Sequence, residues 1–287
     1  MRPGTTRFRF PAAGLAALCW ALRLAAAPYE LLPAKDARIL GLPGYEAANF
    51  QQDMLSVYTY GENVQRTLLQ FDLSQVVLAP GERLASATLR LSASTGFGGS
   101  NGEPMEVYAV ARPWTEEGLT WQRASVASPW TTAGGDIAGT DGVPNSPPFA
   151  VSTASPADGA PVTWDVGELV DRWLEGVAPN HGLLLKSSEG NGLTFTQRES
   201  ASAGLRPGLQ VATEPGPPRL RVGRESATGD VVLSWRGVGT ATLQERAAIG
   251  TGPDWVDSAL TVVPAEGRSV VTVSPAAAWR FYRLRSN

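Results

Sequence analysis

The stretch Ala85-Ser86-Ala87-Thr88-Leu89-Arg90-Leu91 alternates between apolar and polar side chains. Successive side chains of a β-strand point to opposite faces, so this pattern predicts a strand with one buried and one solvated face. Sheets with one solvated face are commonly antiparallel. The stretch therefore favours an antiparallel β-structure.

Further strands are predicted on both sides of this stretch. The chain has 31 glycines and 22 prolines, and only 18% of its residues are charged. This balance favours short strands joined by many turns over long surface helices. The additional strands are expected at residues 66–72, 105–110, 182–186, 193–197 and 209–211.

One short helix is predicted within this β-rich region. Asp165 is placed to cap it, and Glu168 follows three residues later, as in a capping box. Apolar residues from Val166 to Val177 repeat at helical spacing, and Gly176 supplies a stop. We expect this helix to lie across an end or edge of a sandwich and to bury Trp173.

The first 27 residues have the pattern of a signal peptide. Three arginines precede an apolar stretch, residues 12–22, that is too short to span a bilayer. Ala25, Ala26 and Ala27 offer a cleavage site after Ala27 or Ala26. We therefore expect a secreted protein, at the cell surface, in the periplasm or outside the cell. No later segment is long and apolar enough to predict a membrane span.

Cleavage would change both the charge and the cysteine content. Four arginines and no acidic residue lie in residues 1–27, which leaves 20 basic against 27 acidic residues and a net charge of about −7. This balance disfavours a nucleic-acid partner, because binding to a phosphate backbone needs a basic surface. Cys19 is the only cysteine, so the processed chain is expected to have neither disulfides nor thiol chemistry.

The rest of the chain divides into three regions by composition. Residues 31–213 form a long β-rich stretch, and residues 219–287 form a shorter one. Between them, Glu214-Pro215-Gly216-Pro217-Pro218 has the composition of a proline-stiffened linker. Residues 124–161, rich in Ser, Thr, Ala, Gly and Pro, predict long loops with at most one edge strand.

The first β-rich stretch contains an ordered series of motifs. They are Asp36, Asn49-Phe50, Leu55-Ser56-Val57, residues 66–74, residues 86–91, residues 107–110, Trp114-Thr115-Glu116, Leu119-Thr120-Trp121, Trp164-Asp165-Val166, Leu169-Val170 with Trp173, residues 180–185, Gln197-Arg198-Glu199, and Arg206-Pro207 with Leu209. Together these motifs resemble the DNRLRE family of carbohydrate-binding modules. In the C-terminal region, residues 231–235, 242–245 and 279–284 are similar to small fibronectin-like β-domains.

The resemblance implies an all-β fold and a non-catalytic function. For residues 31–213 we expect a jelly-roll-like antiparallel β-sandwich with one short helix, and for residues 219–287 a small C-terminal β-sandwich. The family implies an exported protein that binds a polysaccharide, acidic or neutral. It also suggests a structural calcium ion, for which Asp36 is the candidate ligand, and no other cofactor is expected.

Six residues are candidates for contact with a sugar. Arg38, Arg66 and Arg198 lie in the family-like segments, and a guanidinium can hold a sugar carboxylate through two hydrogen bonds. Tyr58, Tyr60 and Trp130 lie in or near polar loops and could provide flat aromatic platforms. By contrast, we expect Trp114, Trp121, Trp164 and Trp173 to pack in the core.

Two other functions remain open at this point. One is a structural or adhesive surface protein in which the sandwiches are spacers, and the other is a polysaccharide lyase or hydrolase. His181, the only histidine, stands in an Asn-His-Gly turn before a strand. No pair of carboxylates stands out by its spacing, and Asp136–Gly142 is best interpreted as an ordinary turn rather than a calcium loop. The sequence therefore predicts no catalytic constellation.

Overall fold

The fold was analysed in a computed structural model. It describes residues 28–50, 54–79, 81–94, 102, 104–144, 146–153, 159–188, 190–225, 227–237, 239–247, 254–265, 267–274 and 280–287. The predicted signal peptide, residues 1–27, lies outside the described residues.

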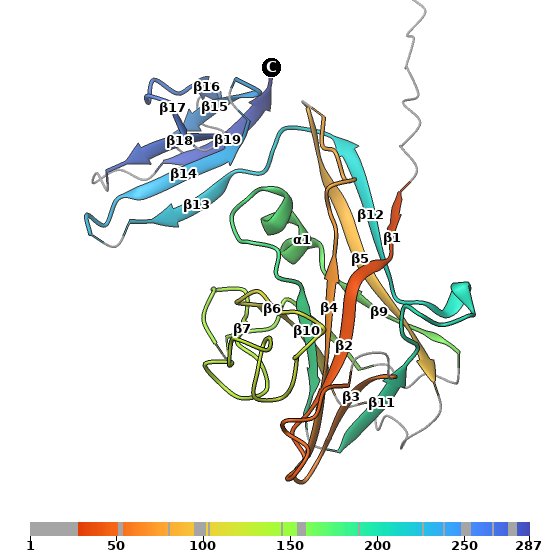
Figure 1. The fold of residues 1–287 in the computed structure, drawn as a ribbon. Coiled ribbons are helices and arrows are strands. Elements are labelled where there is room, and N and C mark those ends of the chain that lie inside the picture. Colours follow the sequence, from red (N-terminus) through yellow and green to blue (C-terminus); the bar gives the residue numbers. More distant parts are fainter. Residues whose placement is uncertain are drawn as a thin grey trace, which may run out of the picture.

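Two antiparallel layers build the first sandwich, which comprises strands β1 to β12 (Figure 1). In the first layer, the long strand β5 pairs with β12 along one stretch and with β9 along another, and β1 pairs with β12. This layer consists of β1 (Tyr29–Leu31), β5 (Glu82–Ser94), β9 (Pro161–Asp165) and β12 (Gly208–Pro215).

The second layer is joined to the first through the pairing of β5 with β11. Its central strand, β4, pairs with β2, β3 and β10, and β6 continues the sheet beyond β10. This layer consists of β2 (Pro33–Leu40), β3 (Leu55–Tyr60), β4 (Asn63–Phe71), β6 (Met105–Val110), β7 (Ile137–Ala138), β8 (Ala150–Ser152), β10 (Leu183–Ser187) and β11 (Asn191–Phe195).

The main hydrophobic core fills the space between these layers. Ala87, Leu89 and Leu91 of β5 are fully buried in it and Ser86 is exposed, as the alternation predicts. Ala85, which was expected on the buried face, is exposed, because the pairing of β5 with β12 shifts register at this point. Trp164 packs edge-on against Phe195, with ring centres 6.1 Å apart. The all-β sandwich predicted from the sequence is confirmed.

Helix α1 (Gly167–Leu174) closes one end of this core. It begins later than predicted, because Val166 rather than Asp165 is its N-cap residue. Asp165 accepts the N–H of Gly167 at 2.9 Å, and Glu168 pairs with Arg172 instead of completing a capping box. Trp173 is 8% exposed within the core, as predicted. A 3₁₀ turn at Ala203–Leu205 precedes β12.

A smaller C-terminal sandwich follows, with two antiparallel sheets around Leu233, Trp235 and Val271. Strand β12 runs through Pro215, so Glu214 and Pro215 belong to a strand rather than to the predicted linker. Among the described residues no helix has the length and apolarity needed to cross a membrane. The sheets contain β13 (Arg221–Arg224), β14 (Val231–Arg236), β15 (Ala241–Arg246), β16 (Val256–Asp257), β17 (Val263–Ala265), β18 (Arg268–Val273) and β19 (Phe281–Ser286).

Candidate functional site

Residues 111–148 cover the outer face of the second layer and form a second apolar core there. From the sheet, Leu68 of β4 and Leu184 of β10 are fully buried in this core. From the covering segment, Trp114 and Trp130 are 1% and 6% exposed. Much of the region predicted to be loops, residues 124–161, therefore belongs to a packed third layer, and β7 and β8 give that region two short strands where at most one was expected.

A cleft of about 450 Å³ opens between this covering segment and the sheet. Its cationic side chains come from two strands of the second layer and from the covering segment: Arg66 from β4, Lys186 from β10, and Arg112 from the start of the covering segment after β6. The remaining lining residues are Ala111, Thr131, Thr132, Ala133, Gly135, Asp136, Ile137, Ala138, Gly142 and Pro144.

Two contacts within the fold hold the Arg66 guanidinium in place. Its carbon lies 4.7 Å from the centre of the Trp121 ring, and Nη1 donates to the carbonyl oxygen of Gly134 at 2.7 Å. The Nε atom is buried without a hydrogen-bond partner, and no carboxylate among the described residues pairs with this arginine. Burial lowers the pKa of Arg66 below its ordinary value. Arg66 thus brings an uncompensated positive charge to the cleft.

The two other cations are each paired with an acid. Arg112 Nε lies 2.8 Å from Asp136, whose carboxylate also accepts the N–H groups of Thr131 and Thr132. Lys186 Nζ lies 3.5 Å from Glu106 and 4.5 Å from the centre of the Tyr108 ring. Asp136 therefore holds the preceding turn at Thr131 and Thr132. Within the predicted turn Asp136–Gly142, residues 137–138 instead form β7, and the turn is confined to Gly139–Gly142, where the N–H of Gly142 donates to Gly139 at 3.0 Å.

The Tyr108 hydroxyl belongs to the same polar group beside the cleft. It donates to Glu106 at 3.0 Å. Burial, with the nearby Glu106 charge, raises the pKa of Tyr108 to about 12. The hydroxyl therefore stays protonated at neutral pH and acts as a hydrogen-bond donor.

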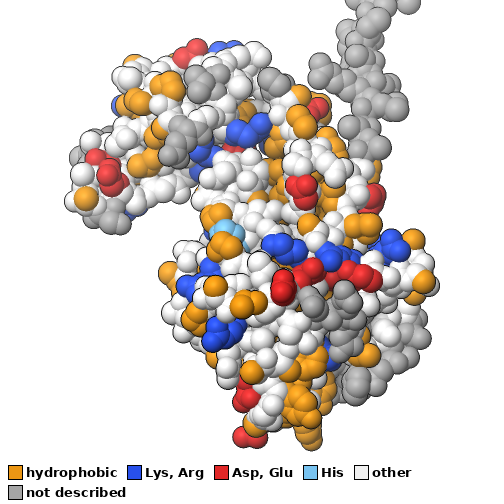
Figure 2. All heavy atoms as spheres, in the orientation of Figure 1, with side chains coloured by type: hydrophobic (Ala, Val, Ile, Leu, Met, Phe, Trp, Pro, Cys, Tyr) orange, Lys and Arg blue, Asp and Glu red, His pale blue; other side chains and the backbone are white. Residues whose placement is uncertain are grey.

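Arg198 lies outside the cleft, in a cluster of three carboxylates. Its guanidinium contacts Glu116 at 3.0 Å, Glu199 at 2.5 Å and Asp36 at 3.5 Å, and it also donates to the carbonyl oxygen of Ala34. In Figure 2, acidic and basic side chains form a mixed band close to the single histidine. This arginine neutralises acids of its own fold, which leaves it little capacity to bind a sugar carboxylate.

The residues around Asp36 do not fit the calcium ion that the family resemblance suggested. Asp36 is 4% exposed, and its carboxylate accepts the backbone N–H of Arg198 at 2.8 Å. The positive charge next to Asp36 is therefore that of the Arg198 side chain, at 3.5 Å, rather than that of a metal ion. Among the described residues no group of three or more acidic, histidine or cysteine side chains could hold a metal ion.

The remaining predicted sugar contacts are spread over the molecule. Arg38 stacks 4.7 Å from the Phe50 ring centre and donates to Gln65 at 3.2 Å. Tyr58 is half-buried, and Tyr60 is 68% exposed at the tip of the β3–β4 hairpin. Trp130 is buried, with Nε1 donating to Thr120 at 3.0 Å, so the structure contradicts its prediction as an exposed platform.

Of the predicted residues, only Arg66 lines the cleft. The sequence did not single out Arg112 or Lys186, because both become neighbours of Arg66 only when residues 111–148 fold back over the sheet. A usable signal was present for Lys186, a lysine at the end of the apolar strand Leu183-Leu184-Leu185. His181 lies before β10, with its N–H directed to the carbonyl oxygen of Pro179 at 3.2 Å, and takes the predicted turn.

Comparison with known proteins places the sandwich in a family. The model of the disaggregatase related repeat domain matches residues 46–211, which is more than half of the chain and includes the cleft and helix α1. This family is related to the DNRLRE modules that the motifs resemble. No curated protein matches the chain. The chain belongs to the disaggregatase related repeat domain family.

Proposed function

We propose that this chain is an exported, non-catalytic protein that binds an extracellular polysaccharide, and that the cleft at Arg66 is the binding site. The observation that carries this proposal is the position of three cations around one open cleft, with Arg66 lacking an acidic partner among the described residues. The net charge near Arg66 is therefore positive, although the whole chain is acidic.

An acidic polysaccharide is the ligand that these groups fit best. Guanidinium groups bind carboxylates through charge-assisted hydrogen bonds, and Arg66 is held in place by Trp121 and Gly134 before any ligand arrives. The overall negative charge opposes such a ligand only weakly, because screening limits its range to about 8–10 Å in physiological salt. The local cations then decide the contact energy.

The arrangement of the buried acids supports the non-catalytic part of the proposal. General acid–base chemistry needs a proton-transferring group, such as a carboxyl group, that can reach the substrate. Asp136, the carboxylate in the cleft lining, is already bound by Arg112 and by the N–H groups of Thr131 and Thr132. Asp36, Asp171 and Glu175 are nearly fully buried, and arginines of the chain lie against each of them. We therefore expect the purified protein to release no reducing ends or unsaturated sugars from a polysaccharide.

Affinity electrophoresis tests the proposal. The protein without residues 1–27 is run through native gels that contain polygalacturonate or a neutral glucan, each at low and at high salt. We expect retardation by polygalacturonate that weakens with salt, and a loss of about 1–3 kcal/mol of binding energy in Arg66→Ala. Arg66→Lys, which keeps the charge without the planar group, should bind with intermediate affinity.

Arg198→Lys is the matched control, since it changes an arginine outside the cleft. It should bind like the wild type. If polygalacturonate retards Arg66→Ala as strongly as the wild type, the binding site lies elsewhere. Retardation by the neutral glucan alone, lost in Tyr60→Ala, would point to the exposed hairpin. Absence of retardation by any polysaccharide would contradict binding and favour a structural or adhesive spacer.

A further inference from the structure

Helix α1 carries two buried carboxylates on the side that faces the C-terminal sandwich. Asp171 and Glu175 are 1% and 5% exposed, and they stand four residues apart at the end of the helix. Figure 1 shows α1 between the C-terminal sandwich and the segment that covers the second layer. A buried carboxylate is costly unless a charged partner compensates it.

Arginines from the C-terminal region supply that compensation. Asp171 pairs with Arg221 of β13 and lies 3.6 Å from Arg219. Arg268 of β18 contacts the Glu175 carboxylate at 3.2 Å and also donates to the main-chain carbonyl oxygen of Glu175. The last carbonyl groups of a helix lack partners within the helix, so this contact also completes the end of α1.

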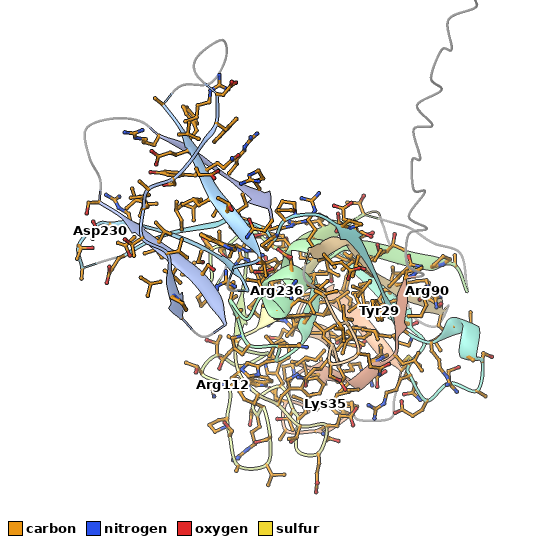
Figure 3. The ribbon with its side chains drawn as sticks, turned by 90° about the horizontal axis from the view of Figure 1, so that it is seen from above. Tyr29, Lys35, Arg90, Arg112, Asp230 and Arg236 are labelled. Atoms are coloured by element: carbon orange, nitrogen blue, oxygen red, sulfur yellow. The ribbon has the colours of Figure 1, made fainter. Side chains whose placement is uncertain are left out.

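Arg236 of β14 adds a contact to another part of the first sandwich. It lies 3.6 Å from Glu175 and donates to the carbonyl oxygens of Leu78 and Glu82 at 3.0 and 3.1 Å. Figure 3 labels Arg236 next to α1. Four arginines of the C-terminal region therefore contact Asp171 or Glu175, and one of them, Arg236, also contacts the start of β5.

Arg172, the residue after Asp171 in helix α1, contacts the wall of the cleft. Arg172 donates to the main-chain carbonyl oxygen of Thr140, and its guanidinium carbon lies 5.0 Å from the Phe149 ring centre. Thr140 stands between Ala138 and Gly142, two residues that line the cleft. One helix thus contacts the C-terminal sandwich through Asp171 and Glu175, and the cleft wall through Arg172.

We propose that the C-terminal sandwich supports the cleft: by holding Asp171 and Glu175 it fixes α1, and α1 fixes the loop at Thr140. The nature of the ligand rests on the proposed function, whereas the support can be measured without any ligand. The C-terminal sandwich is then a positioning element for the site rather than an independent module.

Hydrogen exchange in the full-length protein tests this role. In the structure, the N–H of Gly139 donates to Val143 at 3.2 Å and the N–H of Thr140 donates to Pro147 at 2.9 Å. In the double variant Arg221→Gln/Arg268→Gln we expect these two amides to exchange about tenfold faster, the change expected from losing charge-assisted hydrogen bonds. The amide of Val110, bonded to Gly182 at 2.9 Å in the sheet, should keep its rate.

Arg285→Gln is the matched control, because its ion pair with Asp257 lies in the same sandwich but is more than half exposed on both sides. It should leave Gly139 and Thr140 unchanged. Asp171→Asn/Glu175→Gln repeats the test from the helix side and should give the same local acceleration. The β14 amides report whether the C-terminal sandwich itself stays folded.

Unchanged exchange at Gly139 and Thr140 in both double variants would overturn the proposal. So would an equal acceleration of every amide in the first sandwich, since that would show a global loss of stability. Failure of polygalacturonate binding in the wild type would contradict the proposed function and leave this test intact. If the wild type binds, the arginine double variant should bind several-fold more weakly.

Discussion

The backbone N–H of Arg198 donates to the carboxylate of Asp36 at 2.8 Å, which joins two residues that are 162 positions apart in the chain. The contact connects the segment after β11 to strand β2. Burial of Asp36 nevertheless outweighs this hydrogen bond and raises the pKa of the carboxyl group to about 6. Asp36 is therefore partly protonated in mildly acidic solution.

We predict that Asp36 makes the protein less stable as the pH rises. The folded state binds the proton more tightly than the unfolded state, so the contribution of this group is fully present below about pH 4 and is lost as the pH passes 6. Asp36→Asn should gain about 2–3 kcal/mol in unfolding free energy relative to the wild type between pH 4 and pH 8. Urea unfolding at both pH values measures the difference.

A control for this titration is Asp257→Asn, since the side chain of Asp257 is 58% exposed. Its effect on stability should be small at both pH values. If the stability difference between Asp36→Asn and the wild type is the same at pH 4 and pH 8, Asp36 does not titrate as expected.

We predict that Arg198 contributes to stability rather than to binding. Arg198→Gln would leave Asp36, Glu116 and Glu199 close together without a compensating charge. The cost should be on the order of 2 kcal/mol, below the value for a fully buried pair because Arg198 and both glutamates are partly exposed. Thermal unfolding measures it, and Arg198→Lys should recover part of the loss. A variant with wild-type stability and impaired binding would assign Arg198 to the ligand site.

We predict that Gly134 is needed for the geometry of the cleft. Gly134 has φ +90°, and a Cβ atom there would come within 2.7 Å of Arg66 Nη1 and of the Trp121 ring. Gly142 also lines the cleft and has φ +81°, but a Cβ atom there meets nothing within 4 Å. Both alanine variants carry backbone strain, so a greater loss of binding in Gly134→Ala isolates the contact with Arg66 and Trp121. Equal losses in the two variants would show that backbone strain alone matters.

We predict that Trp130, which is buried, also contributes to the unfolding free energy as a core residue does. Trp130→Ala should cost about 3–5 kcal/mol of unfolding free energy, the range for removing a large buried aromatic side chain. Tyr60→Ala, at an exposed aromatic residue, should change stability by less than about 0.5 kcal/mol. Chemical denaturation compares the two. Wild-type stability in Trp130→Ala would contradict the packed third layer.

The first sandwich was largely predictable because its strands carry a simple period. Leu89 and Leu91 alternate with polar residues, and the burial follows that alternation. The helix was also found, but its start was placed one residue too early because Asp165 can accept the N–H of Gly167 from outside the helix. Local patterns therefore identified the elements better than their ends.

The candidate site was only partly predictable, since it depends on contacts that have no local pattern. Arg66 was selected from its strand, but the covering segment has neither a helical nor a strand period, so Trp130 looked like an exposed loop residue. The cluster of Asp36 with Arg198 links distant positions, and the arginines that reach Asp171 lie beyond the first sandwich. These contacts depend on tertiary packing between distant segments, and no short stretch of the sequence predicts them.

The apolar run Leu183-Leu184-Leu185 in β10 has a consequence for protein engineering. Leu183 and Leu185 are buried in the main core, while Leu184 is buried under the covering segment. Since β10 has no solvated side over these residues, residues 111–148 cannot be treated as a replaceable surface loop. Shortening that segment, or grafting another recognition loop in its place, would expose Leu68 and Leu184 to water and create an apolar patch that promotes aggregation. New specificities are better sought by changing the cleft residues while the segment is kept whole.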